Sequence, residues 1–350
     1  MSHSDPITLP AIAPVANPVL QQQLQHKTNS KTKPPGSLGL LESLAIQLGL
    51  IQQTTSPAII QPQVLVFAAD HGLTAEGISA FPAKVTPQMV HNFLQGGAAI
   101  NVFARQHQLT LQVVDAGVNA DFAPHPQLID RKISKGTQNS RHQPAMTMAE
   151  CCKALHTGMA LVSELPGNLL LVGEMGIGNT SAASLLLARL GNLPVADCTG
   201  RGTGLDDQGL SHKTRVLQAV LEHHSDANTP LQALAALGGL EIAMMTGALI
   251  QAASERRILL MDGFIAGVAL LVAEQLAPGT RDYAVFGHGS AEPGHRQLLR
   301  LLKAEPLLQL NMRLGEGSGA ALAYPLLQSA CAYFNDMASF DDAGVSGAGV

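Results

Sequence analysis

Aromatic residues are scarce in this chain of 350 residues, amounting to 3% of it, and tryptophan is absent. The chain therefore lacks the stacking platforms on which single-stranded nucleic acids bind. Its formal charge is −5 and it has no basic stripe, so the electrostatic signature of a nucleic-acid-binding protein is also missing. Charged residues make up only 13% and apolar residues 46%, which predicts a globular protein with a large core.

The chain also lacks any pattern of paired cysteines. Cys151, Cys152, Cys198 and Cys331 form no CxxC motif, which favours reduced thiols in a cytoplasmic protein. No apolar run reaches the roughly 20 residues of a membrane-spanning helix. The N-terminal segment MSHSDPITLPAIAP has neither the basic nor the continuous apolar region of a signal peptide. We therefore expect a cytoplasmic protein with no membrane partner and no nucleic-acid partner.

Five short apolar runs, each leading into glycine and a polar residue, predict the strands of a parallel sheet. The runs are continuous rather than alternating, which is typical of strands covered on both faces. Strand, glycine-rich loop and helix in repetition indicate an α/β fold with a doubly wound, mostly parallel, Rossmann-like sheet. Such a sheet binds ligands outside the carboxyl ends of its strands. The predicted strands are Val64–Asp70, Leu109–Gly117, Leu169–Gly176, Ile258–Phe264 and Tyr283–Ser290.

The two ends of the chain carry helix and loop signals but no strand signals. We therefore predict that residues 1–60 and 305–350 pair into a small helical domain beside a large α/β domain, residues 61–304. After the first strand, the pattern predicts a helix over residues 86–106, with Thr86 as its N-cap.

The segment GEMGIGNTSAAS, residues 173–184, joins a strand to a helix through three glycines. This geometry directs free amides and a helix dipole toward one point, so a phosphate near Gly176 and Gly178 is one interpretation. The segment is neither a P-loop nor a dinucleotide motif, and a tight turn without a ligand is the alternative.

A second glycine loop, TGRGTGLDDQGLSHK, adds Arg201, Gly202 and Lys213. A guanidinium and an ammonium beside flexible backbone are suited to bind an anion. In the alternative interpretation, Arg201 pairs with Asp206 or Asp207 and the segment is only a long loop.

Two further polar loops follow predicted strands. In DHGLTAEGISAFP, Ser79 and Phe81 are suited to line a pocket for a flat ring, although Phe81 is equally suited to anchor the loop in the core. The segment GHGSAEPGH holds two histidines. A bold interpretation makes a metal site at the strand ends, from Asp70, His71, Asp262 and His288. The alternative is that these side chains bond to loop backbone.

A lone carboxylate, Glu316, lies between Gly315 and Gly317 in RLGEGSGAALA. If it is buried among small residues, its proton affinity rises, and it is suited to be a general base. Alternatively Ser318 caps the following helix, Glu316 is only a favourable charge at its start, and Pro325 bends or restarts that helix one turn in.

Taken together, these segments resemble the nicotinate mononucleotide:5,6-dimethylbenzimidazole phosphoribosyltransferases, which make the lower-ligand nucleotide of cobalamin. The resemblance covers nearly the whole chain in the order of the family. It is carried by KPPGSLGLLESL, FAADHG, EGISAFP, VTPQMVHNFLQGGAAINVFAR, GEMGIGNTS, TGRGTGLDD, LGGLEIAMM, DGFIAG, GHGSAEPGH and RLGEGSGAALAYPLL.

The resemblance implies a phosphoribosyl transfer from nicotinate mononucleotide to dimethylbenzimidazole, without a metal or organic cofactor, in a homodimer. It makes Glu316 the catalytic base. We place Glu174 near the sugar, and the phosphate near both glycine loops and Lys213. The flat base is expected against Ser79, Phe81, Gln88 and Leu314, and Asp262 and Ser290 complete the predicted substrate-binding set.

Two other functions stay open at this point. One is a metal-dependent hydrolase that uses Asp70, His71, Asp262 and His288. The other is a non-catalytic nucleotide-binding sensor, in which Glu316 is a helix-end charge. The small-residue segment LGGLEIAMMTGALIQAA suits close helix packing, either within one chain or between two copies.

Overall fold

A parallel sheet of six strands organises the part of the chain that the computed structural model describes, residues 7–202 and 204–346. The strand order is β3-β2-β1-β4-β5-β6, and every neighbouring pair is parallel. The order reverses between β1 and β4, which is where an open sheet of this kind binds its ligand. The strands are β1 (Gln63–Ala69), β2 (Thr110–Gly117), β3 (Leu128–Asp130), β4 (Leu169–Met175), β5 (Ile258–Met261) and β6 (Ala284–Phe286).

The five predicted strands are present, and the sixth, β3, was missed. β5 and β6 end earlier than predicted, because the chain leaves the sheet after Met261 and Phe286 into polar loops. β3 has only three residues, lies at the sheet edge and is partly exposed. Its segment, LID, contains no continuous apolar run, which was the signal used for the other strands.

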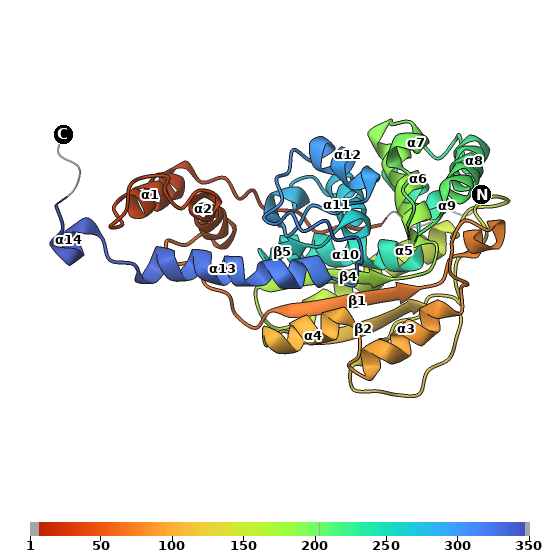
Figure 1. Ribbon diagram of the computed structural model, residues 1–350, viewed down its shortest axis with the longest axis horizontal. Coiled ribbons are helices and arrows are strands. Elements are labelled where there is room, and N and C mark those ends of the chain that lie inside the picture. The colour runs from red at the N-terminus through yellow and green to blue at the C-terminus, as the bar shows by residue number, and fades with distance from the viewer. Residues whose placement is uncertain (1–6, 203, 347–350) are drawn as a thin grey trace.

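Helices cover both faces of the sheet, so the fold is doubly wound, as predicted (Figure 1). One face carries α5 (Met148–Ser163), α10 (Leu240–Ser254) and α11 (Phe264–Leu276). The other carries α3 (Val85–Leu94), α4 (Ala99–Gln106) and α13 (Ser318–Asp336). Further helices are α1 (Pro18–Asn29), α2 (Leu40–Gln52), α6 (Asn179–Gly191), α7 (Val195–Cys198), α8 (Asp207–His223), α9 (Pro230–Leu237), α12 (Pro293–Leu301) and α14 (Phe340–Ala343), with the short 3-10 helices η1 (Gly72–Glu76) and η2 (Thr280–Tyr283).

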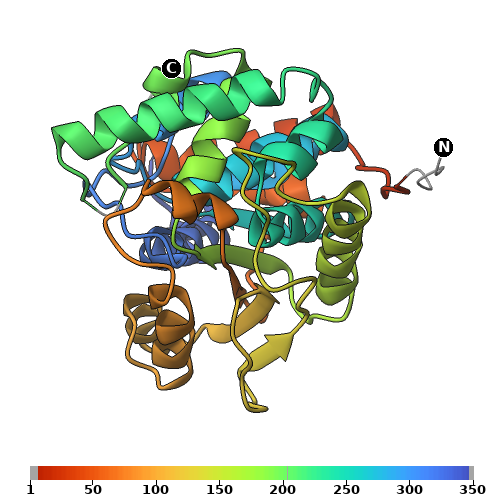
Figure 2. The ribbon, with the colours of Figure 1, turned by 90° about the vertical axis from the view of Figure 1, so that its right-hand side faces the viewer.

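Figure 2 shows the same layers from the side, with α3 and α4 at the lower left beside the yellow strands and the green helix α8 across the top. Among the described helices, none combines the length and the hydrophobicity that a membrane span requires.

The helix predicted over residues 86–106 is in fact two helices, α3 and α4. The chain breaks at Gly96, whose φ of +77° lies in the left-handed region that ends helices. Asn101 joins the two pieces: its side-chain amide donates to Phe93 O at 2.9 Å, and its side-chain oxygen accepts from Ala98 N at 3.1 Å. The prediction of one continuous helix was therefore wrong at the glycine pair.

The predicted N-cap of this helix was also wrong. α3 begins at Val85, and Lys84 occupies the N-cap position. Thr86 is buried, and its hydroxyl oxygen accepts from Ile177 N at 3.0 Å. Thr86 therefore holds the loop after β4, a contact with a distant segment that the local sequence pattern does not reveal.

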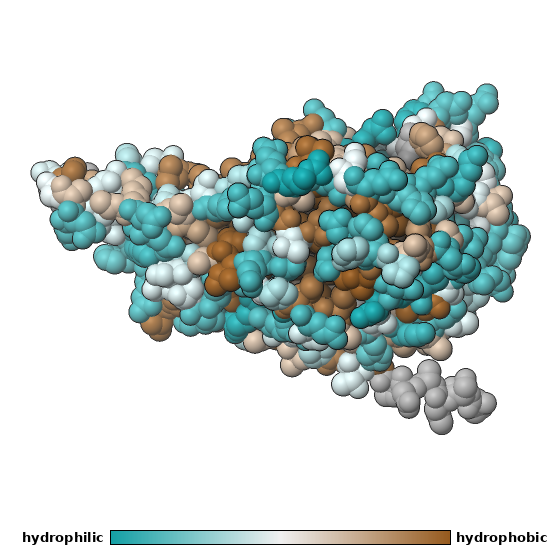
Figure 3. Space-filling model, turned by 90° about the horizontal axis from the view of Figure 1, so that it is seen from below, coloured by the Kyte–Doolittle hydropathy of each residue, from teal (hydrophilic) through white to brown (hydrophobic). Residues whose placement is uncertain are grey.

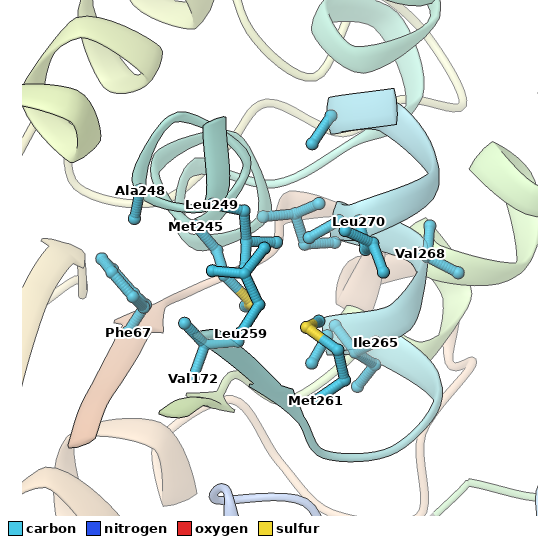
Figure 4. Packing of buried hydrophobic residues seen from close by; sticks show 14 of the residues in the cluster. Phe67, Val172, Met245, Ala248, Leu249, Leu259, Met261, Ile265, Val268 and Leu270 are labelled. Atoms are coloured by element: carbon cyan, nitrogen blue, oxygen red, sulfur yellow. The ribbon is translucent and has the colours of Figure 1, made fainter. Parts of the chain in front are cut away.

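Buried hydrophobic residues fill the space between the central strands and the helices α10 and α11 (Figure 4). Phe67, Val172 and Leu259 from β1, β4 and β5 face Met245 and Leu249 of α10. α10 is buried along nearly its whole length. The segment LGGLEIAMMTGALIQAA therefore forms core within this chain, which was one of its two predicted roles.

α5 and α10 cross at close range because glycines face each other's backbone. A Cβ atom added at Gly158 would lie 1.9 Å from Met244 O, and one added at Gly247 would lie 2.0 Å from Leu155 O. Neither position has room for a side chain, because the obstructing atoms belong to the backbone.

We expect Gly247→Ala to lower the free energy of unfolding by about 3 kcal/mol, because overpacking exceeds the roughly 1 kcal/mol that alanine gains in a helix. Urea denaturation at 25 °C would measure the change. Gln251→Ala, in the same helix but only partly buried, is the control and should stay within about 0.5 kcal/mol of the wild type. Equal stability of Gly247→Ala and the wild type would contradict the close crossing.

The two ends of the chain meet beside the sheet. α2 packs against both α1 and α13. Thr32 N donates to Ala338 O at 3.1 Å, and Phe340 N donates to Ser30 O at 2.9 Å. The terminal helices extend beyond the sheet at one end in Figure 1 and form the narrow projection in Figure 3. The division into two domains at residues 60 and 305 stays a prediction.

α13 runs unbroken from Ser318 to Asp336, although Pro325 lies inside it. We predicted that Pro325 would bend or restart this helix, because proline removes a backbone donor. Tyr324 and Leu327 beside it are buried. Their packing outweighs the lost hydrogen bond, and the helix continues.

Candidate active site

A cavity of about 330 Å³ lies beyond the carboxyl ends of β4, β5 and β6. It lies next to the point where the strand order reverses, which is where this topology predicts a ligand site. Of the predicted site residues, its wall contains Phe81, Glu174, Gly176, Gly202, Asp262, Ser290, Leu314 and Glu316.

Glu316 is buried in this wall on an unusual stretch of backbone. Gly315, Glu316 and Gly317 have φ angles of +88°, +65° and +84°. Glycine adopts such angles freely, but a glutamate does so at a cost, so the surrounding contacts must hold it there. A Cβ atom at Gly173 in β4 would lie 2.2 Å from Glu316 O. The glycine in β4 thus lets this loop lie directly on the strand.

The carboxylate of Glu316 faces the start of α4, where Ile100 N donates to its Oε2 at 3.3 Å. Burial raises the pKa of Glu316 above its ordinary value, and the nearby negative charge of Asp262 raises it further, whereas the Ile100 amide lowers it. A carboxylate of raised proton affinity in a cavity wall is suited to accept a proton from a ligand.

Asp262, which follows β5, caps the helix that begins after Glu316. Its carboxylate oxygens accept from the amides of Gly317, Gly319 and Ala320 at 3.2, 2.7 and 3.1 Å. Ser318, the alternative cap, instead donates its hydroxyl to a carbonyl oxygen. Asp262 was predicted to bind substrate, and it lines the larger cavity. Both of its oxygens accept from amides at the α13 N-terminus, which suits it to hold Glu316 in position.

Glu174, at the end of β4, is buried beside Glu316. The side-chain amide of Asn179, the first residue of α6, donates to Glu174 Oε2. A Cβ atom at Gly315 would lie 2.1 Å from Glu174 Oε1. Burial, followed by the charge of Asp262, raises the pKa of Glu174 well above its ordinary value. The Glu174 side chain therefore lies between the start of α6 and the loop formed by Gly315, Glu316 and Gly317.

A smaller cavity of about 30 Å³ adjoins the first at the start of α6. Lys213 is almost completely buried here, and its Nζ donates to Thr180 Oγ1 at 3.1 Å. Burial lowers the pKa of Lys213 to about 8. A helix start, glycine backbone and an ammonium together suit an anion such as phosphate. The predicted site residues that line this cavity are Ser79, Gly176, Gly178, Arg201, Gly202 and Lys213.

Arg201 lines the smaller cavity beside the glycine loops, whereas Ser79 occupies a place other than that predicted. Arg201 is half exposed and forms an ion pair with Asp207, which was one of the alternatives considered from the sequence. Ser79 lines the smaller cavity, whereas Phe81 lines the larger one. The chain bends between them, with Phe81 N donating to Ser79 Oγ at 3.3 Å.

Phe81 and Leu314 lie at the mouth of the larger cavity, where 48% and 57% of their surfaces are exposed. Phe81 is therefore not a core anchor. Val85 and Met89 of α3 line the wall beside them. Gln88 lies on the exposed side of α3, outside the wall of either cavity.

A phosphoribosyltransferase family model, DBI_PRT, matches residues 13–345. The chain belongs to this phosphoribosyltransferase family. Relatives from Variovorax paradoxus (strain S110) and Ralstonia nicotianae are both 55% identical, the first over 97% of each chain and the second over 94% of this chain and 95% of its own. Both are named nicotinate-nucleotide–dimethylbenzimidazole phosphoribosyltransferase.

The fold of this phosphoribosyltransferase agrees with that of solved relatives. The crystal structure of CobT from Thermus thermophilus matches with a TM-score of 0.91 at 42% identity. The match covers 95% of this chain and 100% of that one. The chain is thus an enzyme of the pentosyltransferase class, and the predicted family and α/β fold are confirmed.

The residues of the hydrolase alternative are used within the enzyme's own structure. His71 Nε2 lies 2.7 Å from Glu241 Oε1, and His288 Nε2 lies 3.4 Å from Asp262 Oδ1. Asp70 Oδ2 accepts from a loop amide at 2.8 Å. Throughout residues 7–202 and 204–346, no three His, Cys, Asp or Glu side chains are grouped to hold a metal ion. The geometry therefore does not support the metal-dependent hydrolase. Membership of a phosphoribosyltransferase family favours an enzyme over the non-catalytic sensor.

Three features of the phosphoribosyltransferase site were missed from the sequence. They are the start of α4 that faces Glu316, the Asn179 amide that holds Glu174, and the buried Glu292 in the wall of the larger cavity. The first depends on a contact between segments 216 residues apart, whereas Asn179 follows Glu174 by only five residues in the same glycine loop. Glu292 lies within GHGSAEPGH, where the histidines drew the interpretation toward metal. The sequence did contain a signal for Glu292, because it is an acid in a glycine-containing segment, as Glu316 is.

Proposed function

We propose that this phosphoribosyltransferase transfers the phosphoribosyl group of nicotinate mononucleotide to 5,6-dimethylbenzimidazole, giving nicotinate and α-ribazole 5′-phosphate. Relatives that are 55% identical carry these two substrates in their names. The observation that carries the proposal is Glu316, a buried carboxylate of raised pKa in a cavity that adjoins a smaller cavity suited to an anion. The product would be the nucleotide of the lower ligand of cobalamin.

In the proposed reaction, a benzimidazole nitrogen attacks C1 of the ribose while the bond from C1 to the nicotinate nitrogen breaks. The pyridinium ring takes the bonding electrons and leaves as a neutral ring, so no general acid is needed. Attack from the opposite face inverts C1 from β to α. The N–H proton of the benzimidazole passes to Glu316, and the cavity contributes by positioning both rings.

The two cavities suggest how the nucleotide would lie. We place the phosphate at the smaller cavity and the flat acceptor at the mouth of the larger one, which leaves the ribose between them. A ligand-bound structure with the phosphate beyond hydrogen-bond distance of both glycine loops would contradict this placement. The proposed phosphate-binding residues are Ser79, Gly176, Gly178, Arg201, Gly202 and Lys213, with Glu174 and Ser290 near the sugar and Phe81 and Leu314 at the acceptor.

The direct test is to incubate the purified protein with both substrates and EDTA, and to quantify nicotinate and α-ribazole phosphate by chromatography. Equal amounts of both products are expected, because we propose that the reaction needs neither a metal nor an organic cofactor. Nicotinate alone would mean that the acceptor is another base or water. Neither product from folded protein would overturn the proposed function.

Binding of the nucleotide should weaken as the pH rises through about 8, because Lys213 then loses its proton. The phosphate is dianionic throughout this range, so the change reports the lysine. We expect the Kd of nicotinate mononucleotide to rise by roughly tenfold or more between pH 7 and pH 9.5. Titration calorimetry on a Glu316→Gln background would measure it without turnover.

Lys213→Arg provides the matched control, because arginine stays protonated over this range. Its Kd should change little with pH, whereas Lys213→Met should bind weakly at every pH. A wild-type Kd that is independent of pH would show that Lys213 does not hold the phosphate.

We also propose that the enzyme is a cytoplasmic homodimer. The resemblance to the family supports the dimer, and the cysteine pattern supports the location. Light scattering of the purified protein would give a mass of about twice 36.5 kDa if the dimer is correct.

A further inference from the structure

Glu292 is a buried acid that the proposed mechanism leaves without a role. Its surface is 7% exposed, and it lines the larger cavity. Thr180 and Gly202 line both cavities, so they mark the junction between the two. A Cβ atom on Gly200, two residues before Gly202, would lie 1.9 Å from Glu292 Oε2, which places the carboxylate beside this junction.

The loop that carries Glu292 is held rigidly. Ser290 Oγ accepts from Glu292 N at 3.3 Å, and Ser290 N donates to His295 Nδ1 at 2.8 Å. Burial lowers the pKa of His295 to about 4, so its ring is neutral and accepts this bond. Ala291 N donates to Met312 O at 2.9 Å. The histidine in this motif therefore fixes the position of Glu292.

The structure leaves room for the Glu292 carboxylate but gives it no partner. A Cβ atom at Gly200 would lie 1.9 Å from Glu292 Oε2, so a side chain there would displace the carboxylate. Among the described residues, none donates a hydrogen bond to this carboxylate or forms an ion pair with it. Burial raises the pKa of Glu292, as it does for a carboxyl group that lacks donors. Buried polar groups normally have partners, so a ligand is expected to supply them.

A carboxylate at this junction fits a ribose better than a phosphate. It repels phosphate oxygens, whereas its two oxygens can accept from two neighbouring hydroxyl groups. Acidic side chains bind ribose hydroxyls in this way in nucleotide-binding folds of the same strand order. We infer that Glu292 binds the 2′ and 3′ hydroxyls of the nucleotide, and that it makes the enzyme selective for ribose over deoxyribose. This inference rests on the proposed function.

Glu174 is the competing candidate for the ribose hydroxyls. One of its oxygens already accepts from Asn179, and the other lies against Gly315. Glu174 is therefore engaged by the protein, whereas Glu292 is open to the cavity. The geometry favours Glu292 for the hydroxyls and leaves Glu174 to support the Glu316 loop.

Binding can test this inference without turnover, by calorimetry with nicotinate mononucleotide and its 2′-deoxy and 3′-deoxy analogues. We expect the wild type to bind each analogue at least tenfold more weakly than the ribonucleotide. In Glu292→Ala the ribonucleotide and its analogues should bind within about threefold of each other. Glu292→Gln should keep part of the preference, because its amide still provides one acceptor.

Gly200→Ala is the second variant, because its methyl group displaces the carboxylate without removing it. It should lose the ribose preference as Glu292→Ala does. Glu305→Gln, at an exposed acid outside both cavities, is the control and should keep it. Thermal unfolding would show that each variant is folded.

An unchanged preference in Glu292→Ala would overturn the inference while leaving the proposed function intact. If Glu174→Gln lost the preference instead, the ribose would belong to Glu174. If the wild type did not bind nicotinate mononucleotide at all, the proposed function and this inference would fail together.

Discussion

Glu316→Gln is expected to lower kcat by about 10²–10⁴-fold, because the acceptor then has no group to take its N–H proton. The substitution keeps the shape of the side chain and removes its proton affinity. The Kd of nicotinate mononucleotide should change by less than about threefold, since we place Glu316 at the acceptor end of the proposed site. Steady-state kinetics and calorimetry would measure the two effects separately.

The pH profile and a modified acceptor sharpen this test. In the wild type, kcat should rise with pH through the raised pKa of Glu316, because only the ionised form accepts a proton. The glutamine variant should lack this rise. With 1-methylbenzimidazole, which has no N–H proton, the two proteins should turn over at similar rates. If the variant were equally impaired with that acceptor, Glu316 would not be the base. Glu305→Gln is the matched control with full activity.

Asp262→Ala should cost about 3 kcal/mol of unfolding free energy and lower kcat by about 100-fold or more. It leaves the amides of Gly317, Gly319 and Ala320 buried without an acceptor. Those amides begin α13 directly after Glu316, so the base would lose its fixed position. Thermal unfolding and steady-state kinetics would measure the two losses.

Asp262→Asn separates positioning from stability alone. It removes the negative charge that raises the pKa of Glu316, so the acid limb of the kcat profile should move to lower pH. A purely structural role for Asp262 would leave that limb in place. A variant with wild-type kcat and an unmoved limb would contradict the positioning role.

The sheet was predictable because its central strands are buried on both faces and therefore read as continuous apolar runs. β3 escaped because it is a short, partly exposed edge strand. The break at Gly96 follows the local glycine signal, which the prediction of one helix disregarded. At Pro325 the expected restart is absent, because packing of the neighbouring side chains keeps α13 continuous.

The place of Glu316 in the cavity wall was predictable because glycines flank it. Gly315 leaves room for Glu174, and Gly317 adopts a left-handed φ of +84°. The role of Asp262 was not, since its hydrogen bonds reach amides at least 55 residues further along the chain. Gln88 was expected at the acceptor, yet α3 turns Val85 and Met89 toward the cavity instead. Such assignments depend on which face of the helix is buried. Gln88 and Met89 are adjacent in sequence but lie on different faces of α3, and only Met89 lines the cavity.

The break between α3 and α4 connects the choice of acceptor to the chemistry. α3 contributes side chains to the wall where the acceptor would lie, while α4 contributes the amide that donates to Glu316, the proposed base. Asn101 holds the end of α3 and the start of α4 in a fixed arrangement. A substitution such as Met89→Leu changes only a side chain of the wall, so we expect it to leave the backbone of α4 in place. The acceptor range of this enzyme can therefore diverge through side chains on one helix, while the backbone of the next keeps proton transfer constant.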